Sequence, residues 1–69
     1  MKNFEGTMEK KCREWLGKEI SDKLNTDQIC ELRAQTYRAY SDLVIKFGKD
    51  AAKAYGADQV CRDLANQFI

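Results

Sequence analysis

The side chains that could carry chemistry in this sequence are few and scattered. Histidine is absent, and the three cysteines lie far apart, at Cys12, Cys30 and Cys61. Histidine is the commonest general base in proteins, and a zinc site normally needs four Cys or His ligands in close pairs. The glycines are isolated and form no phosphate-binding loop. The sequence therefore predicts no catalytic residue, no metal site and no cofactor, and we expect a protein that is not an enzyme.

One group of side chains could bind an anion. Arg33 falls inside an apolar helical stripe, beside Tyr37 and Tyr40. An unpaired charge in an apolar setting is costly, so this arginine must form an ion pair or reach solvent. One interpretation is an ion pair with Glu19, which lies in the apolar sector of the preceding helix. The other is a site for a small anion or a nucleotide, formed by Arg33, Tyr37 and Tyr40.

The elements that position these side chains are expected to be helices throughout. Proline is absent, and Ala, Leu, Lys, Glu, Gln and Arg are frequent, which favours helix. The apolar periodicity predicts an all-α fold, with helix starts near Thr7 and Asp27 and a helix end at Gly56. Either Asn25 or Thr26 is expected to cap the second helix. We expect one domain over residues 1–69, with a short helix at about 7–24, a long central helix at about 27–55 and a short helix at about 58–68.

Gly48 raises the question of whether the central helix is continuous. The apolar and polar faces keep one phase from residue 28 to residue 55, whereas a break normally resets the phase. A glycine inside a helix costs only about 1 kcal/mol. We therefore expect the helix to run through Gly48. The alternative is a helix that ends at Phe47, with Gly48 in a left-handed conformation.

The central helix carries more apolar surface than one core needs. Beside its core stripe lies a flank of mostly small residues, which are Ala34, Ser41, Ile45, Gly48 and Ala52. Their steps of seven, four, three and four are typical of a helix–helix seam, although Arg38 occupies one seam position. We interpret this flank as an interface with a second copy of the chain or with a partner protein. The alternative is that another helix of the same chain covers it.

A basic surface also lies on the outer face of the central helix. It consists of Arg38, Lys46, Lys49 and Lys53. Such a row usually indicates a solvated face, and Asp42 interrupts it. A contact surface for a phosphate backbone is the alternative.

The carboxy-terminal segment over 50–68 partly resembles a helix-turn-helix motif. The resemblance rests on Ala52, followed after three residues by Gly56 and then by a capped helix in AAKAYGADQVCRDLANQF. The resemblance implies a nucleic-acid-binding regulator. The segment departs from the motif at Arg62, where a buried aliphatic residue is usual, and Asp58 and Asp63 would face phosphates.

Size and charge complete these expectations. The chain has 69 residues and a net charge of +1, so bulk charge favours neither nucleic acid nor a mimic of it. No apolar run is long enough for a membrane span or a signal peptide, which favours the reduced cytoplasm. A chain this short often needs a further source of stability, and self-association is the one left open. We expect a helical bundle completed as a homodimer, which acts by stoichiometric binding as an adaptor or as an inhibitor of a larger intracellular machine. Phage and plasmid accessory factors are proteins of this type.

Overall fold

The computed structural model describes residues 5–69, which form helices without strands. The helices are α1 (Thr7–Leu16), α2 (Lys18–Ser21), α3 (Thr26–Phe47), α4 (Lys49–Tyr55) and α5 (Ala57–Ala65). The predicted all-α class and the long central helix are therefore confirmed. Along these residues, none of the helices has both the length and the hydropathy that crossing a membrane requires.

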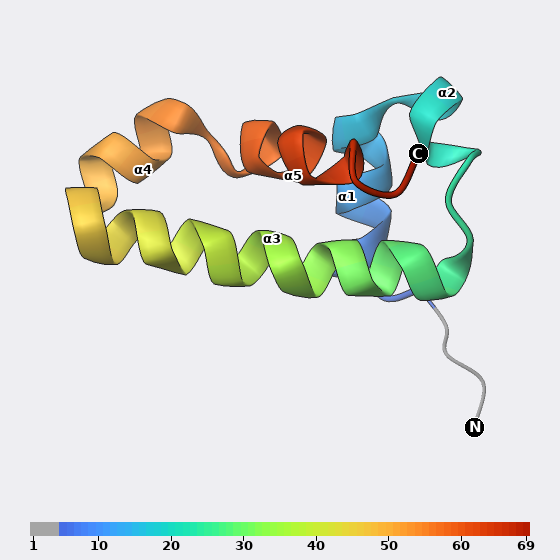
Figure 1. The fold of residues 1–69 in the computed structure, drawn as a ribbon, viewed down its shortest axis with the longest axis horizontal. Coiled ribbons are helices and arrows are strands. Elements are labelled where there is room, and N and C mark those ends of the chain that lie inside the picture. The colour runs from blue at the N-terminus through green and yellow to red at the C-terminus, as the bar shows by residue number, and fades with distance from the viewer. Residues whose placement is uncertain (1–4) are drawn as a thin grey trace.

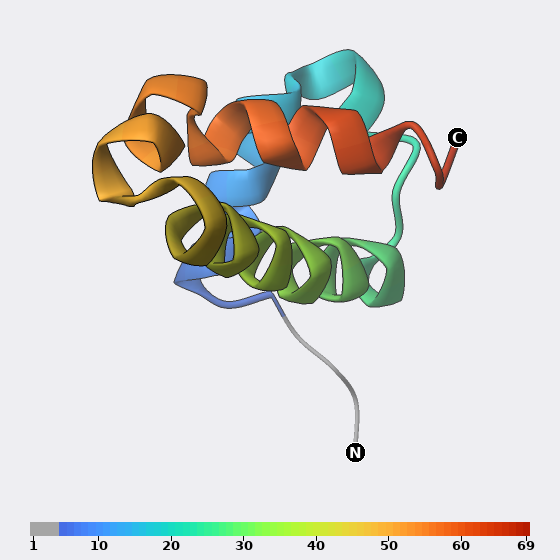
Figure 2. The same ribbon diagram turned by 60° about the vertical axis from the view of Figure 1, so that its left-hand side comes forward.

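The long helix α3 is the base on which the other helices are arranged (Figure 1). At its far end α4 reverses the chain, so that α5 returns along α3 (Figure 1). Helix α1 crosses this pair and contacts both α3 and α5. Figure 2 shows the same arrangement from the side, with α5 above α3.

The start of α3 is fixed by a reciprocal pair of hydrogen bonds. Asn25 Oδ1 accepts from the backbone N–H of Gln28 at 2.8 Å, and Gln28 Oε1 accepts from the backbone N–H of Asn25 at 2.9 Å. Both bonds satisfy amides that a helix end would otherwise leave unpaired. Of the two caps that the sequence left open, Asn25 fills this role, and α3 begins at Thr26, one residue before the predicted start near Asp27.

The prediction of a continuous central helix over about 27–55 is wrong. Helix α3 ends at Phe47, because Gly48 adopts a φ of 91° and a ψ of 164°. Such values are essentially restricted to glycine. The break lets α4 turn back, and Ala52 is then only 1% exposed. A straight helix would instead have carried α5 away from α3.

The prediction of one helix over about 7–24 is wrong for the same reason. Gly17 has a φ of 83°, so α1 ends at Leu16 and α2 is a single turn. The last helix also differs from its predicted range of about 58–68, since α5 covers Ala57–Ala65 and the next residues form a turn. Gly56, the predicted end, does separate α4 from α5.

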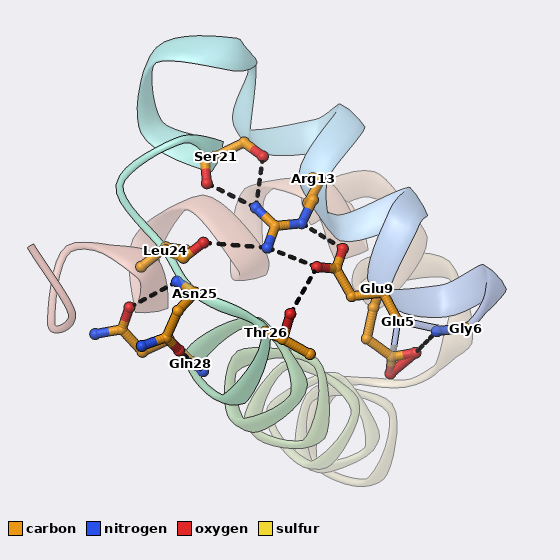
Figure 3. Close-up of polar contacts among 9 residues, drawn as sticks. All are labelled: Glu5, Gly6, Glu9, Arg13, Ser21, Leu24, Asn25, Thr26 and Gln28. Atoms are coloured by element: carbon orange, nitrogen blue, oxygen red, sulfur yellow. Dashed lines mark hydrogen bonds and ion pairs between the residues drawn. The ribbon is translucent and has the colours of Figure 1, made fainter. Parts of the chain in front are cut away.

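The segment between α1 and α3 is held by Arg13 (Figure 3). Its Nη1 donates to the Ser21 carbonyl at 2.7 Å, and its Nη2 donates to the Leu24 carbonyl at 3.1 Å. The Glu5 carboxylate accepts from Arg13 and also from the Thr26 hydroxyl at 3.2 Å. One guanidinium thus joins α1, the end of α2 and the segment before α3, and Glu5 connects it to Thr26, the first residue of α3.

The core lies where α1, α3 and α5 meet. Its buried members are Cys12, Leu16, Leu24, Ile29, Leu32, Cys61 and Ala65. The apolar stripe of α3 predicted a core along the whole central helix, but this expectation fails in the carboxyl half. Tyr37 is 68% exposed and Phe47 is 67% exposed, because the core helices cover only the first half of α3.

Candidate functional site

The predicted interface flank is divided by the break at Gly48. Ala34 and Ser41 are half-buried on α3, and Ile45 is 80% exposed. Gly48 lies exposed at the end of α3, whereas Ala52 is buried on α4. The alternative of cover within the chain therefore holds for Ala52, which cannot line an interface with another molecule. Ser41 and Ile45 remain together on the surface.

An open groove runs along this exposed part of α3. Its volume is about 490 Å³, and it is lined by Tyr37, Tyr40, Ser41, Val44 and Ile45. Most of this lining is apolar. Tyr37 and Ile45, its most exposed side chains, lie one turn to either side of Ser41. Two large, exposed apolar side chains beside an open groove make this surface a candidate binding surface.

The predicted partner of Arg33 is wrong. Arg33 Nε lies 2.8 Å from Oε2 of Glu9, while Glu19 is exposed on α2. The N–H of Nε does not point at that oxygen, so the contact is an ion pair without an aligned hydrogen bond. Glu9 is 8% exposed, and its Oε1 accepts from the Gly6 N–H at 3.1 Å (Figure 3). The guanidinium is therefore held against a carboxylate that is itself fixed at the start of α1.

The three residues of the predicted anion site line one cavity. Arg33, Tyr37 and Tyr40 from α3 face Met8 and Trp15 from α1 across a space of about 190 Å³. The wall is almost entirely apolar. Tyr37 and Tyr40 also line the open groove, so the cavity and the groove share one wall.

Thr36 is a cavity residue that the sequence analysis did not select. It is 5% exposed, and among residues 5–69 its hydroxyl makes no aligned hydrogen bond. The hydroxyl lies close to the Cys61 thiol, but sulfur is a weak hydrogen-bond partner. The sequence signal was its place on the core stripe, where a threonine brings a polar group into an apolar setting.

The predicted basic surface does not form a row on one helix. Arg38 and Lys46 lie on α3, whereas Lys49 and Lys53 lie on α4 beyond the break. All four side chains are exposed. The residues are therefore solvated, and the turn at Gly48 divides them between two helix directions.

The segment that resembles a helix-turn-helix motif has a different joint. Gly56 alone separates α4 from α5, while the motif uses a turn of three or four residues. On α5, Arg62 pairs with Asp58 at 3.1 Å. Asp63 accepts hydrogen bonds from Tyr55 and from Gln59. These polar side chains are engaged with one another within the chain.

The cysteines are free thiols in two different settings. Cys12 and Cys61 meet in the core, and Cys30 is half-buried on α3. Contact with the Cys61 thiol, together with burial, raises the pKa of Cys12 well above its ordinary value. A thiol that stays neutral is a poor nucleophile and a poor metal ligand. Residues 5–69 also contain no group of three or more His, Cys, Asp or Glu side chains that could hold a metal ion.

Comparison with known proteins gives this chain no relative. No family model matches it, and no curated protein or solved structure shows significant similarity to it.

Proposed function

We propose that this protein acts by stoichiometric protein binding through the exposed face of α3. The observation that carries the proposal is the open groove, where Tyr37 and Ile45 are 68% and 80% exposed on either side of Ser41. Burying such side chains against a partner removes apolar surface from water and favours association.

The spacing on α3 supports a second copy of the chain as the partner. Tyr37 and Ile45 lie four residues before and after Ser41, and Ala34 and Gly48 lie seven residues before and after it. Along either direction of the chain, the side chains of this face therefore alternate in size: small, large, small, large and small. Two antiparallel copies related by a two-fold axis at Ser41 would bring Tyr37 of each against Ile45 of the other. The small Ser41 side chain would let the helices approach closely at the crossing.

The charges beside this face are compatible with self-association. Arg38 and Asp42 are exposed on α3 and carry opposite signs. These two charges flank Ser41 and cancel, so the centre of the proposed crossing has no net charge, while Lys46 adds a positive charge further along α3. In the wider proposal the protein works in the cytoplasm as an adaptor or inhibitor of a larger assembly.

The mass of the protein in solution tests this proposal. Sedimentation equilibrium over a range of concentrations should give twice the chain mass of 8.0 kDa. Ile45→Glu places a charge in the groove and should give the single-chain mass. Ile69→Glu is the matched control, since Ile69 is also an exposed isoleucine but lies outside the groove. A wild-type chain that stays monomeric up to millimolar concentration would refute self-association.

The two-fold register has its own test. In a Cys30→Ser background, Ser41→Cys should form a disulfide between copies under mild oxidation. Asp42→Cys is the control, because the neighbouring position points about 100° away around the helix. Equal cross-linking at both positions would refute the crossing at Ser41.

A further inference from the structure

We propose that the cavity between α1, α3 and the start of α5 binds a small neutral aromatic molecule that carries no polar group. This proposal does not rest on self-association, because Ile45, the proposed dimer contact, lies in the groove and does not line the cavity. The volume of the cavity and the chemistry of its wall define the ligand.

The volume sets the size of the ligand. The cavity has a volume of about 190 Å³. An apolar cavity of about 150 Å³ in a protein core stays dry and binds benzene. A single aromatic ring with a methyl substituent therefore fits this space.

The wall offers a ligand almost no nitrogen or oxygen atoms. Arg33 Nε and the Thr36 hydroxyl are both inaccessible, so these two residues line the cavity with their carbon atoms. The charge of Arg33 is balanced by Glu9, whose Oε2 lies 2.8 Å from Arg33 Nε. An ion or a strongly polar ligand would lose its hydrogen bonds to water here and would gain none in return, which is costly. The cavity therefore selects a neutral and apolar molecule.

The wall also carries groups that pack well against an aromatic ring. Trp15 comes from α1, Tyr37 and Tyr40 come from α3, and Met8 adds a thioether. Aromatic rings attract one another in offset or edge-to-face arrangements, and a thioether sulfur attracts the edge of a ring. These contacts favour an aromatic ring over a saturated ring of the same size.

Two residues of the wall give the ligand a way in. Met8 is 46% exposed and Tyr37 is 68% exposed, so this part of the wall borders solvent. A methionine side chain is unbranched and flexible, and it can move without repacking the buried core. Binding therefore does not require α1 to separate from α5.

A fluorescence titration with toluene tests the proposal. Trp15 is the only tryptophan of the chain and lines the cavity, so its emission reports occupancy. Toluene should change the emission saturably, below its limit of solubility, and should raise the melting temperature. Phenol should bind at least about tenfold more weakly, because its hydroxyl loses water and gains no partner. Benzoate should give no saturable change. Methylcyclohexane, a saturated ring with the same substituent, should bind no more tightly than toluene.

Two further measurements place the ligand in the cavity. The methyl resonance of Met8 should shift when toluene is added, because the ring current of a bound aromatic molecule acts on nearby nuclei. Ala57→Leu should abolish toluene binding by filling the cavity from the start of α5. Ala51→Leu is the matched control, since Ala51 is exposed on α4 and lies outside the cavity. Circular dichroism checks that both variants fold, and the Met8 shift tests the site in the wild-type protein without any variant.

Several results would overturn the proposal. Absence of a saturable toluene signal and of a Met8 shift in the wild-type protein removes the site. Equal affinity for toluene and benzoate contradicts the selection for a neutral ligand, and tighter binding of methylcyclohexane contradicts the aromatic preference. Unchanged toluene affinity in a folded Ala57→Leu variant shows that toluene binds elsewhere. The Ile45→Glu variant should still bind toluene, so failure of self-association and failure of this site give different results.

Discussion

Replacing Gly48 with alanine should lower the free energy of unfolding, although the same change stabilises an ordinary helix. Gly48 has a φ of 91° and a ψ of 164°. A Cβ at this position would meet no atom within 4 Å, so the change causes no steric clash with the rest of the chain. The whole effect therefore comes from forcing an L-residue into a backbone region that essentially only glycine adopts.

The magnitude follows from this backbone region. A non-glycine residue held there costs about 1–3 kcal/mol. For a chain of this size, a loss of about 2 kcal/mol lowers the melting temperature by about 8–16 °C. If the helix instead continued through Gly48, alanine would gain about 1 kcal/mol from its higher helix propensity. A break at Gly48 thus predicts that Gly48→Ala lowers the free energy of unfolding, whereas a continuous helix predicts that it raises it.

Urea unfolding followed by far-ultraviolet circular dichroism measures this difference. A synthetic chain with D-alanine at position 48 is the matched control, because the D-residue adopts positive φ and should retain the wild-type stability. An L-alanine variant that is more stable than the wild-type protein would refute the break between α3 and α4.

Three further predictions concern the core, the charges and the thiols. Leu32→Ala should lower the free energy of unfolding by about 2–5 kcal/mol in urea titrations, because Leu32 is fully buried; a loss below 1 kcal/mol would contradict the core. The hydrogen bond from Arg13 holds the pKa of Glu5 below its ordinary value of 4.5, so the unfolded chain binds more protons there. This contribution to stability is present above pH 4.5 and is lost as the pH falls through the folded-state pKa. Glu5→Gln should flatten that acid dependence in pH-resolved melting, while the exposed Glu14→Gln should not. A thiol reagent should label the half-buried Cys30 before the two buried cysteines, as read by mass spectrometry of digested peptides, and simultaneous labelling would contradict the packing of α1 on α5.

The helical class and several helix ends could be predicted from the sequence because local chemistry determines them. Asn25 and Gln28 form a capping pair between neighbouring residues, and its bonds do not depend on distant parts of the chain. The helix end at Gly56 likewise follows from a local signal. The composition favours helix at almost every position, so the all-α class required no tertiary information.

The breaks at Gly17 and Gly48 could not be predicted in this way. A helical wheel records the period of each segment, and the period is unchanged when a single residue separates two helices. What decides the break is the surface buried after the turn. Ala52 becomes buried only because α4 folds back, and α5 reaches α1 and α3 only from that position. These contacts join distant parts of the chain, and a local sequence pattern contains no information about them.

The partner of Arg33 depended on tertiary structure in the same way. Glu9 and Glu19 were both acidic residues of the first predicted helix, but the break at Gly17 separates them. Glu9 stays on α1, where it meets α3, and Glu19 moves to the exposed turn of α2. The three residues of the predicted anion site all lie on α3, so their proximity follows from the spacing of one helix. They do line one cavity.

The break at Gly48 also accounts for the uncovered surface on α3. Helix α5 is short and returns toward α1, so the described chain leaves Tyr37 and Ile45 uncovered. The turn that completes the core thus creates the groove, and Tyr37 and Tyr40 separate that groove from the cavity behind it.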